Sequence, residues 1–336
     1  MTFEIPVWFE IASMAVLTAI LIADLLLIVR RPHIPKMGEA AAWVGFYVAL
    51  ALVFAGFLFW AAEGAKADAA GQFIAGWLTE YSLSVDNLFV FVLLMTQFAV
   101  PRRYQQRVLM VGIIIALVLR GLFILLGAAL IENFSWIFYL FGLFLVYTAW
   151  RQAFPGKEEH DAQTETGIVR FLRRFVDISD GYDGSKLRTV VDGKRIWTPM
   201  VLVFIAIGFT DLIFAIDSIP AIFGITRSAF IVFAANVFAL MGLRQLYFLL
   251  GGLLDRLRYL HYGIAFILAF IGVKLFFHAL HVNELPFVNG GQHVEWAPEI
   301  STWVSLGAIV AAMTVATVAS VVASRRDDRK AASERP

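Results

Sequence analysis

Two short acidic motifs lie within apolar stretches of this sequence and hold the side chains best suited to chemistry. The first motif is Glu80–Asn87 and the second is Asp211–Ser218. In each, a second acid follows the first by six residues, and a small polar side chain comes next. Carboxylate, amide and hydroxyl oxygens are hard donors that suit Mg²⁺, Ca²⁺ or Mn²⁺. The motifs therefore predict a cation site, and its candidate ligands are Asp24, Glu80, Asp86, Asn87, Asp211, Asp217 and Ser218, with Ser84 as a further oxygen donor.

Three cations within apolar stretches are the candidate charge partners of these acids: Arg120, Arg244 and Lys274. An ionised side chain at the centre of a bilayer costs about 2.5–3.5 kcal/mol on insertion scales, so unpaired acids there need a compensating role. Five acids against three cations leave two negative charges, which one divalent cation balances. Permanent interhelical ion pairs are the structural alternative. Each arginine either releases an acid when the ion binds or stays a fixed counter-ion, and Asp24 is a candidate partner of Lys274.

The composition places these motifs in a membrane. Hydrophobic residues make up 60% of the 336 residues, charged residues only 16%, and the mean hydropathy is +0.78. This excludes an ordinary soluble domain. The net charge of +1 gives no field for a nucleic-acid partner. Because the chain has no cysteine, disulfides, thiolate metal sites and a cysteine nucleophile are excluded.

Nine stretches have the length and apolar character of membrane-spanning helices. Together they predict one all-α transmembrane domain over residues 1–324, followed by a disordered tail over residues 325–336. The predicted spans are Val7–Val29, Ala40–Ala62, Phe73–Val100, Val108–Ile131, Phe134–Ala153, Thr198–Ile219, Ala229–Leu250, Tyr262–His281 and Thr302–Ala323.

The distribution of basic residues predicts the orientation of the chain. With nine spans, 22 of the 27 Lys and Arg residues fall in segments on one side of the membrane. Basic residues favour the cytoplasmic side, so the N-terminus is expected outside and the C-terminus inside. A missed or extra span would destroy this alternation. The sequence thus predicts a multi-pass protein of the membrane.

The one sizeable polar segment, residues 155–197, is then expected to be a cytoplasmic loop. Within it, Gly167–Phe175 has the pattern of a short amphipathic helix at the membrane surface. Further along, Leu187–Val191 and Lys194–Trp197 flank an Asp-Gly pair and predict a β-hairpin. A small structured loop without chemistry is the simpler interpretation of this segment.

An internal repeat links the two motifs. Leu119–Gly127 resembles Leu243–Gly251, and the order of features is the same over residues 73–153 and 198–281. Each unit holds three predicted spans, namely spans 3–5 and spans 6–8. Since three is odd, the second unit must cross the membrane upside down relative to the first. Inverted repeats of this kind are used by many secondary transporters, whose sites lie at the repeat interface.

The spacing within each motif constrains how its two acids meet an ion. Six residues of an ideal helix turn through about 600°, so the two acids point about 120° apart. Either each helix serves two neighbouring faces, or its winding breaks between the acids. Gly208 and Pro220 bracket the second motif, and a break would expose backbone carbonyls. We favour a break that lets the acids converge at the repeat interface.

Both motifs resemble the signature segments of the TerC/Alx family of bacterial membrane proteins. The similarity rests on Glu80-Tyr-Ser-Leu-Ser-Val-Asp-Asn-Leu-Phe-Val-Phe and Phe209-Thr-Asp-Leu-Ile-Phe-Ala-Ile-Asp-Ser-Ile-Pro-Ala, and it extends over roughly residues 10–285. The resemblance implies an inner-membrane exporter of divalent metals, chiefly Mn²⁺, despite the family's historical name for tellurium resistance. It places Glu80, Asp86, Asn87, Asp211, Asp217 and Ser218 on the motif positions, and Asp24 on an acid of the first helix.

Several functions stay open at this point. The leading one is an alternating-access Mn²⁺ exporter, with protons as a candidate coupling ion, the bilayer as its environment and no permanently bound cofactor. Others are a carrier of Ca²⁺ or another cation, indirect resistance to tellurium or to alkaline or metal stress, and a membrane scaffold. An intramembrane hydrolase with paired aspartates fits less well, because no Ser/His/Asp or metalloprotease motif supports an enzyme.

Overall fold

The computed structural model describes residues 3–333 apart from 31–35, 135, 155–177, 180, 185, 192–193, 251–258, 284, 287 and 295. Helices dominate this part of the chain. They are α1 (Val7–Arg30), α2 (Met37–Ala61), α3 (Lys66–Gln97), α4 (Arg102–Asn133), α5 (Ile137–Ala153), α7 (Pro199–Phe223), α8 (Ala229–Leu240), α9 (Leu243–Leu250), α10 (Leu260–His281), the 3₁₀ turn η3 (Asn289–Gly291) and α11 (Thr302–Ser333). The short strands are β1 (Phe3–Glu4), β2 (Glu63–Gly64), β3 (Arg188–Val191) and β4 (Lys194–Trp197).

Helices occupy all nine predicted span positions, and seven of these positions are long and apolar enough to cross a membrane. The count refers to the described residues alone. The two positions outside this count are α3 and α5, and α5 has only 17 residues. The chain is thus an integral membrane protein with many apolar helices.

The predicted seventh span is not one continuous helix. It divides into α8 and α9 at Met241 and Gly242, and Gly242 has a φ of 81°. A left-handed backbone of this kind favours glycine, because a Cβ there would meet the preceding and following peptide groups. The Tyr47 ring of α2 also closes the space at Gly242, since a Cβ would lie 2.8 Å from Cδ2 of that ring.

The break that the sequence predicts within the acidic motifs is absent from the described helices. α3 continues from Lys66 to Gln97 and α7 from Pro199 to Phe223, so both motifs lie on unbroken helices. Pro220 stays inside α7, one turn before the helix ends. Because proline has no backbone N–H, it removes the helical hydrogen bond to the carbonyl of Ile216, yet α7 continues to Phe223. The backbone is therefore helical between the two acids of each motif.

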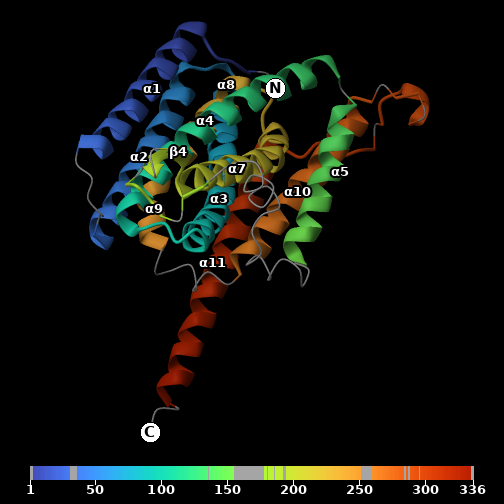
Figure 1. The fold of residues 1–336 in the computed structure, drawn as a ribbon. Coiled ribbons are helices and arrows are strands. Elements are labelled where there is room, and N and C mark those ends of the chain that lie inside the picture. The colour runs from blue at the N-terminus through green and yellow to red at the C-terminus, as the bar shows by residue number, and fades with distance from the viewer. Residues whose placement is uncertain are drawn as a thin grey trace.

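α3 is the central helix of the bundle (Figure 1). It packs against α2, α7, α8, α9, α10 and α11. Its buried side chains belong to two apolar clusters, one of which includes Phe91 and Met95 and the other Phe73 and Trp77. A helix with neighbours on so many sides can present polar side chains to more than one of them.

The packing between the two halves of the chain is reciprocal. α4 packs against α7, and α3, which corresponds to α7 in the repeat, packs against α8, which corresponds to α4. α5 packs against its counterpart α10 over a long interface. At their crossing, a Cβ on Gly142 would lie 2.8 Å from the carbonyl oxygen of Gly272, and a Cβ on Gly272 would lie 2.9 Å from that of Gly142. Only two glycines let the backbones approach this closely.

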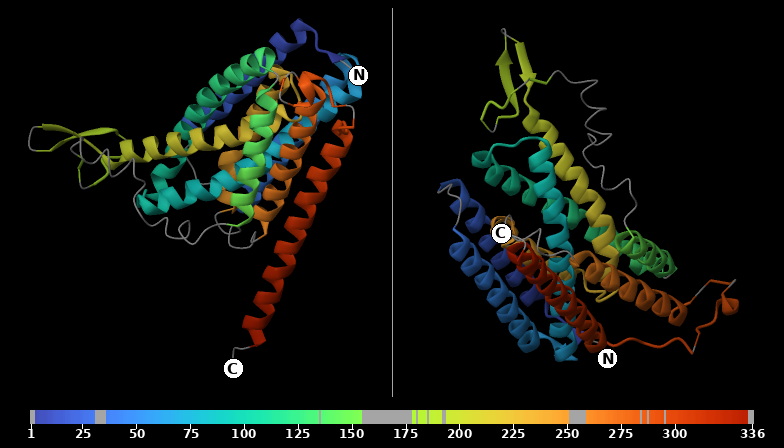
Figure 2. Two further views of the ribbon diagram at one scale, coloured as in Figure 1. Left: turned by 90° about the vertical axis from the view of Figure 1, so that its right-hand side faces the viewer. Right: turned by 90° about the horizontal axis from the view of Figure 1, so that it is seen from below.

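The loop between the halves contains the hairpin at the position where the sequence predicts one. β3 pairs antiparallel with β4, and the guanidinium of Arg188 lies 3.8 Å from the ring centre of Trp197. The hairpin extends away from the helices, beyond the start of α7 (Figure 2). Tyr182 connects the loop to the bundle, because its hydroxyl donates a 2.6 Å hydrogen bond to the carbonyl of Phe98 at the end of α3. The predicted surface helix over Gly167–Phe175 lies outside the described residues.

The C-terminal segment differs from its prediction. α11 continues to Ser333, so residues 325–333 are helical, whereas the sequence analysis predicts a disordered tail from residue 325. The helix projects well beyond the bundle (Figure 1). Alanine, arginine and lysine are strong helix formers, and they fill much of this extension.

Candidate functional site

Arg120 is the centre of a buried charged cluster. Its side chain forms ion pairs with Glu80 of α3 and with Asp211 of α7, the first acids of the two motifs. Nη2 of Arg120 donates to Oδ1 of Asp211 over 3.3 Å. Each of the three residues is at most 2% exposed. The structure therefore brings together the corresponding acids of both repeats on one arginine.

Two asparagines complete the surroundings of this arginine. Nη1 of Arg120 donates to Oδ1 of Asn236 over 3.1 Å, and Nδ2 of Asn236 donates to the carbonyl of Val232. With its amide oriented to suit both neighbours, Asn87 accepts from Nη2 of Arg120 at 3.3 Å and donates to the carbonyl of Leu83 at 3.0 Å. The guanidinium is thus held by groups from α3, α7 and α8.

Asn236 is a site residue that the sequence analysis did not single out. It is the one polar residue of α8, whose other eleven positions are apolar. A buried amide in such a helix needs a partner, so its isolation was a usable signal. Reasoning from acids alone passes over it, because an amide carries no charge to balance.

The backbone explains how these side chains meet. Glu80 and Asn87 are seven residues apart on α3, which returns them to nearly the same face of the helix. That face is turned toward the helices of the other repeat, α7 and α8, and toward α4 from its own repeat. The position of Arg120 in the middle of α4 gives its long side chain access to both acids.

Several oxygens around the cluster are buried and have no hydrogen-bond partner among the described residues. They are Oε2 of Glu80, Oδ2 of Asp211 and the hydroxyl oxygens of Ser84 and Ser218. Buried polar atoms are almost always paired in folded proteins, so each unpaired one needs an explanation. All four are hard oxygen atoms of the kind that bind Mn²⁺ or Ca²⁺. The donor set therefore fits such an ion.

The second acids of the motifs, Asp86 and Asp217, lie on α3 and α7 by their backbone, but their side chains fall outside the described part of the structure. Each is six residues, or about 9 Å, along its helix from the first acid. Among the described side chains, no three His, Asp or Glu residues are grouped as a metal site would need.

The other two predicted charge partners lie elsewhere. Arg244 interacts electrostatically with Asp24 of α1 and with Tyr47 of α2, and the Tyr47 hydroxyl donates a 2.8 Å hydrogen bond to Oδ1 of Asp24. The expected pairing of Asp24 with Lys274 is wrong. Nζ of Lys274 instead donates to the hydroxyl of Ser305 over 3.0 Å, on the side of the bundle where α11 begins. The sequence alone does not indicate which helices are neighbours in the bundle, so it could not predict the partners of Asp24 and Lys274.

The geometry defines a polytopic helical membrane protein with a charged cluster buried between α3, α4, α7 and α8. Residues 65–328 match the model of the integral membrane protein TerC family, and the chain belongs to this family. The uncharacterized membrane protein Rv2723 of Mycobacterium tuberculosis is 48% identical over 319 residues, which cover 92% of this chain and 79% of the relative.

Two further relatives come from other bacteria. The uncharacterized membrane protein STKORF319 of Myxococcus xanthus is 37% identical over 93% of this chain and 91% of its own length. A relative from Escherichia coli K12, which bears the provisional name of a membrane-bound redox modulator, Alx, is 43% identical over 82% of this chain and 89% of its own length. No solved structure gives a significant match.

Proposed function

We propose that this protein is a bacterial inner-membrane transporter that exports hard divalent cations, with Mn²⁺ as the first candidate. The observation that carries the proposal is the meeting of Glu80 and Asp211, corresponding acids of two similar halves, on the buried guanidinium of Arg120. A membrane-buried acid pair of this kind is costly and marks an ion pathway more often than a purely structural contact.

The reciprocal packing supports an inverted repeat. Two units related by a two-fold axis make each contact twice. If one helix of the first unit packs against a given helix of the second, the corresponding helix of the second unit packs against the corresponding helix of the first. The pairs α4 with α7 and α3 with α8 follow this rule. The crossing of α5 and α10 does so at residue level, since Gly142 and Gly272 each approach the other's carbonyl. Transporters with inverted repeats bind their substrate at the interface of the units.

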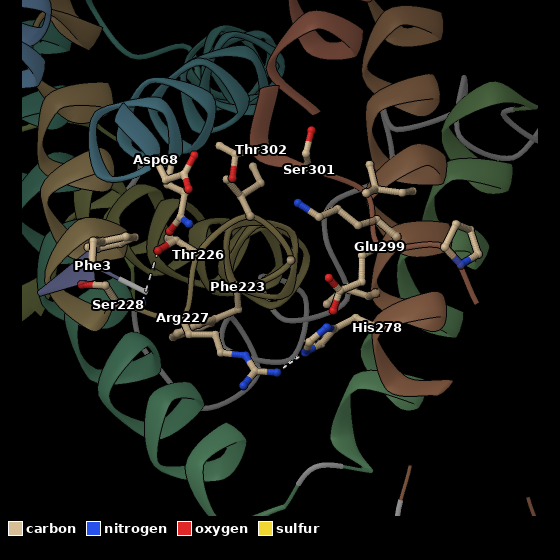
Figure 3. A pocket seen from close by; sticks show the side chains of 17 residues that line it. Phe3, Asp68, Phe223, Thr226, Arg227, Ser228, His278, Glu299, Ser301 and Thr302 are labelled. Carbon is tan, nitrogen blue, oxygen red and sulfur yellow. Dashed lines mark hydrogen bonds between the residues drawn. The ribbon is translucent and has the colours of Figure 1, made fainter. Parts of the chain in front are cut away.

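The nine-span topology is supported by a cavity that we call the vestibule. It has a volume of about 590 Å³, and Asp68, Phe223, Ser228, His278 and Thr302 are among its lining residues (Figure 3). These five residues come from the start of α3, the end of α7, the start of α8, the end of α10 and the start of α11. All five helix ends lie outside the membrane in the nine-span arrangement with an external N-terminus. The vestibule is then its outer mouth.

The charge of the site matches a cation as the transported substrate. Glu80, Asp211 and Arg120 together carry a net charge of −1 when all are ionised, and Asp86 and Asp217 add further negative charge along the same helices. A divalent ion engages the free carboxylate oxygens, with Ser84 and Ser218 as neutral donors. Proton binding to an acid would neutralise the empty site for its return. Protons are therefore the proposed coupling ion.

The name of the Alx relatives raises a redox role. This chain has no cysteine, so it cannot itself carry out thiol–disulfide chemistry. We therefore place any redox effect downstream of a change in cellular metal content. Ca²⁺ is the alternative substrate, because it accepts the same oxygen donors.

Transport into inside-out membrane vesicles tests the proposal. We expect vesicles with the wild type to accumulate Mn²⁺, and the variants Asp86→Asn and Asp217→Asn to lower the initial rate by about tenfold or more. Asp183→Asn is the control, because this acid lies in the loop and pairs with Lys186 and Thr189 rather than with the buried cluster. Normal transport by both motif variants would show that the site is wrong. Ca²⁺ uptake without Mn²⁺ uptake by the wild type would overturn the substrate and leave the architecture intact.

A further inference from the structure

The vestibule contains two cations that lack an acidic partner among the described residues. Lys274 has one hydrogen bond, to the neutral hydroxyl of Ser305. The guanidinium of Arg227 lies against Nε2 of His278, which accepts from it, and over the ring of Phe138 at 5.1 Å. Figure 3 shows Arg227 and His278 directed toward each other at the edge of the cavity. Two cations thus line this space beside the carboxylates of Asp68 and Glu299, and among the described residues neither cation forms an ion pair with an acid.

Two helices also begin at the vestibule wall. α8 follows Ser228, whose hydroxyl accepts from the amide of Ile231, and α11 begins at Thr302 after Ser301. The first amides of a helix have no intrahelical acceptors, and the aligned peptide dipoles place partial positive charge there. Both ends place partial positive charge beside Lys274 and Arg227, while the C-terminal ends of α7 and α10 place partial negative charge at the same vestibule.

The carboxylates of the vestibule are accounted for by other interactions. Oε1 of Glu299 lies 3.2 Å from Nε2 of His281, which is outside the cavity lining. Asp68 is in the first turn of α3, where an acid offsets the positive end of that helix. Neither reduces the charge on Lys274 or Arg227 by direct pairing.

We propose that the vestibule binds the phosphate group of an anionic ligand, either a phospholipid headgroup or free phosphate. Arginine and lysine side chains together with helix N-termini form the usual surroundings of a bound phosphate. The volume of about 590 Å³ is large enough for a glycerophosphate headgroup as well as for the small ion. The site is separate from the acid cluster, so this inference does not depend on the proposed transport function.

Binding measurements on the purified full-length protein test the inference. In detergent, inorganic phosphate is expected to raise the melting temperature of the wild type. In lipid nanodiscs, native mass spectrometry is expected to detect retained phosphatidylglycerol if the ligand is a lipid. The variants Lys274→Gln and Arg227→Gln should each weaken binding of the true ligand by about tenfold. Lys66→Gln is the matched control, because this exposed cation lies at the start of α3 and does not line the vestibule.

The two arms distinguish the sources of the phosphate. Loss of phosphate-dependent stabilisation in both variants identifies the free ion, and loss of retained phosphatidylglycerol with no response to phosphate identifies the lipid. Arg227 lies between helices, so Arg227→Gln keeps the test valid if Lys274→Gln fails to fold. The proposal is overturned if the folded variants bind phosphate and phosphatidylglycerol as the wild type does, or if the wild type binds neither.

Discussion

Arg120 and Asp211 are 91 positions apart in the sequence, yet Nη2 of the arginine lies 3.3 Å from Oδ1 of the aspartate inside the bundle. The contact connects α4 of the first repeat with α7 of the second, and the same arginine pairs with Glu80 of its own repeat. One guanidinium thereby connects α3, α4 and α7 through charge in the interior of the bundle. A structural change that separates the halves has to break this contact.

Replacement of Arg120 by methionine should strongly destabilise the protein. The variant keeps most of the side-chain volume but leaves Glu80 and Asp211 buried without a counter-ion. Removal of one partner from a buried pair costs about 3–5 kcal/mol. The measurement is the free energy of unfolding in detergent.

A triple variant separates charge from packing in this experiment. Glu80→Gln, Arg120→Met and Asp211→Asn together remove all three charges, and the free energy of unfolding should recover most of the loss. Equal stability of the wild type and the single variant would contradict the cluster as described.

Gly142→Ala should disrupt the crossing of α5 and α10. The new Cβ would lie 2.8 Å from the carbonyl oxygen of Gly272, and backbone cannot move aside as a flexible side chain can. Overpacking of this kind costs about 1–3 kcal/mol. Gly45→Ala is the control, because no atom lies within 4 Å of a Cβ there. Thermal unfolding should show a lower midpoint for the first variant only, and equal midpoints would refute the close crossing.

Asn236→Leu should weaken the hold on Arg120. The substitution removes the amide oxygen that accepts from Nη1, and a hydrogen bond to a charged group is worth about 1.5–3 kcal/mol. Asn133→Leu is the matched control. Both asparagines donate to the carbonyl four residues earlier, but Asn133 is exposed and does not contact the cluster. Chemical unfolding should show a larger loss of unfolding free energy for Asn236→Leu than for Asn133→Leu. An equal loss in both variants would mean that the hydrogen bond to the backbone carbonyl, rather than the contact with Arg120, accounts for the effect.

Tyr182 should make the attachment of the loop sensitive to alkaline pH. Burial raises its pKa to about 12, from about 10 in an unfolded chain. The protonated hydroxyl is the form that donates to Phe98, so its stabilising contribution is complete below pH 10. It is lost as the pH rises from 10 through 12.

A spin label can follow this release, because the chain has no cysteine to interfere. A label on Ser179→Cys should become more mobile between pH 10 and 12 in the wild-type background. With Tyr182→Phe it should already be more mobile at pH 8. A label whose mobility is the same in both backgrounds at pH 8 would argue against this bond as the attachment.

The elements of this fold could largely be predicted because the membrane imposes a strong pattern. Long apolar runs indicate α1, α2, α4, α7, α10 and α11 directly, and the Asp-Gly pair indicates the hairpin. The break between α8 and α9 could not be found this way. Glycine is common in membrane helices, and the close approach of Tyr47 that accompanies the break at Gly242 comes from a distant helix.

The candidate site was predictable in its charges and not in its contacts. The repeat identified Glu80, Asp211 and Arg120, since matching residues of two units tend to meet at their interface. The predicted break within the motifs was wrong. It was inferred from the sequence of each helix alone, which does not specify the neighbouring helices. Lys274 was predicted to pair with Asp24 because of their opposite charges. In the structure the start of α11 lies near Lys274, which donates to Ser305 instead.

The Tyr47 ring at Gly242 has a consequence for the role of the first two helices. The match to the TerC family begins at residue 65, so α1 and α2 precede the matched region. These two helices nevertheless contact the broken span through Tyr47 and provide Asp24 to Arg244. Substitutions in α1 and α2 at these two contacts are therefore expected to change the stability of the broken span while the acidic motifs stay unchanged.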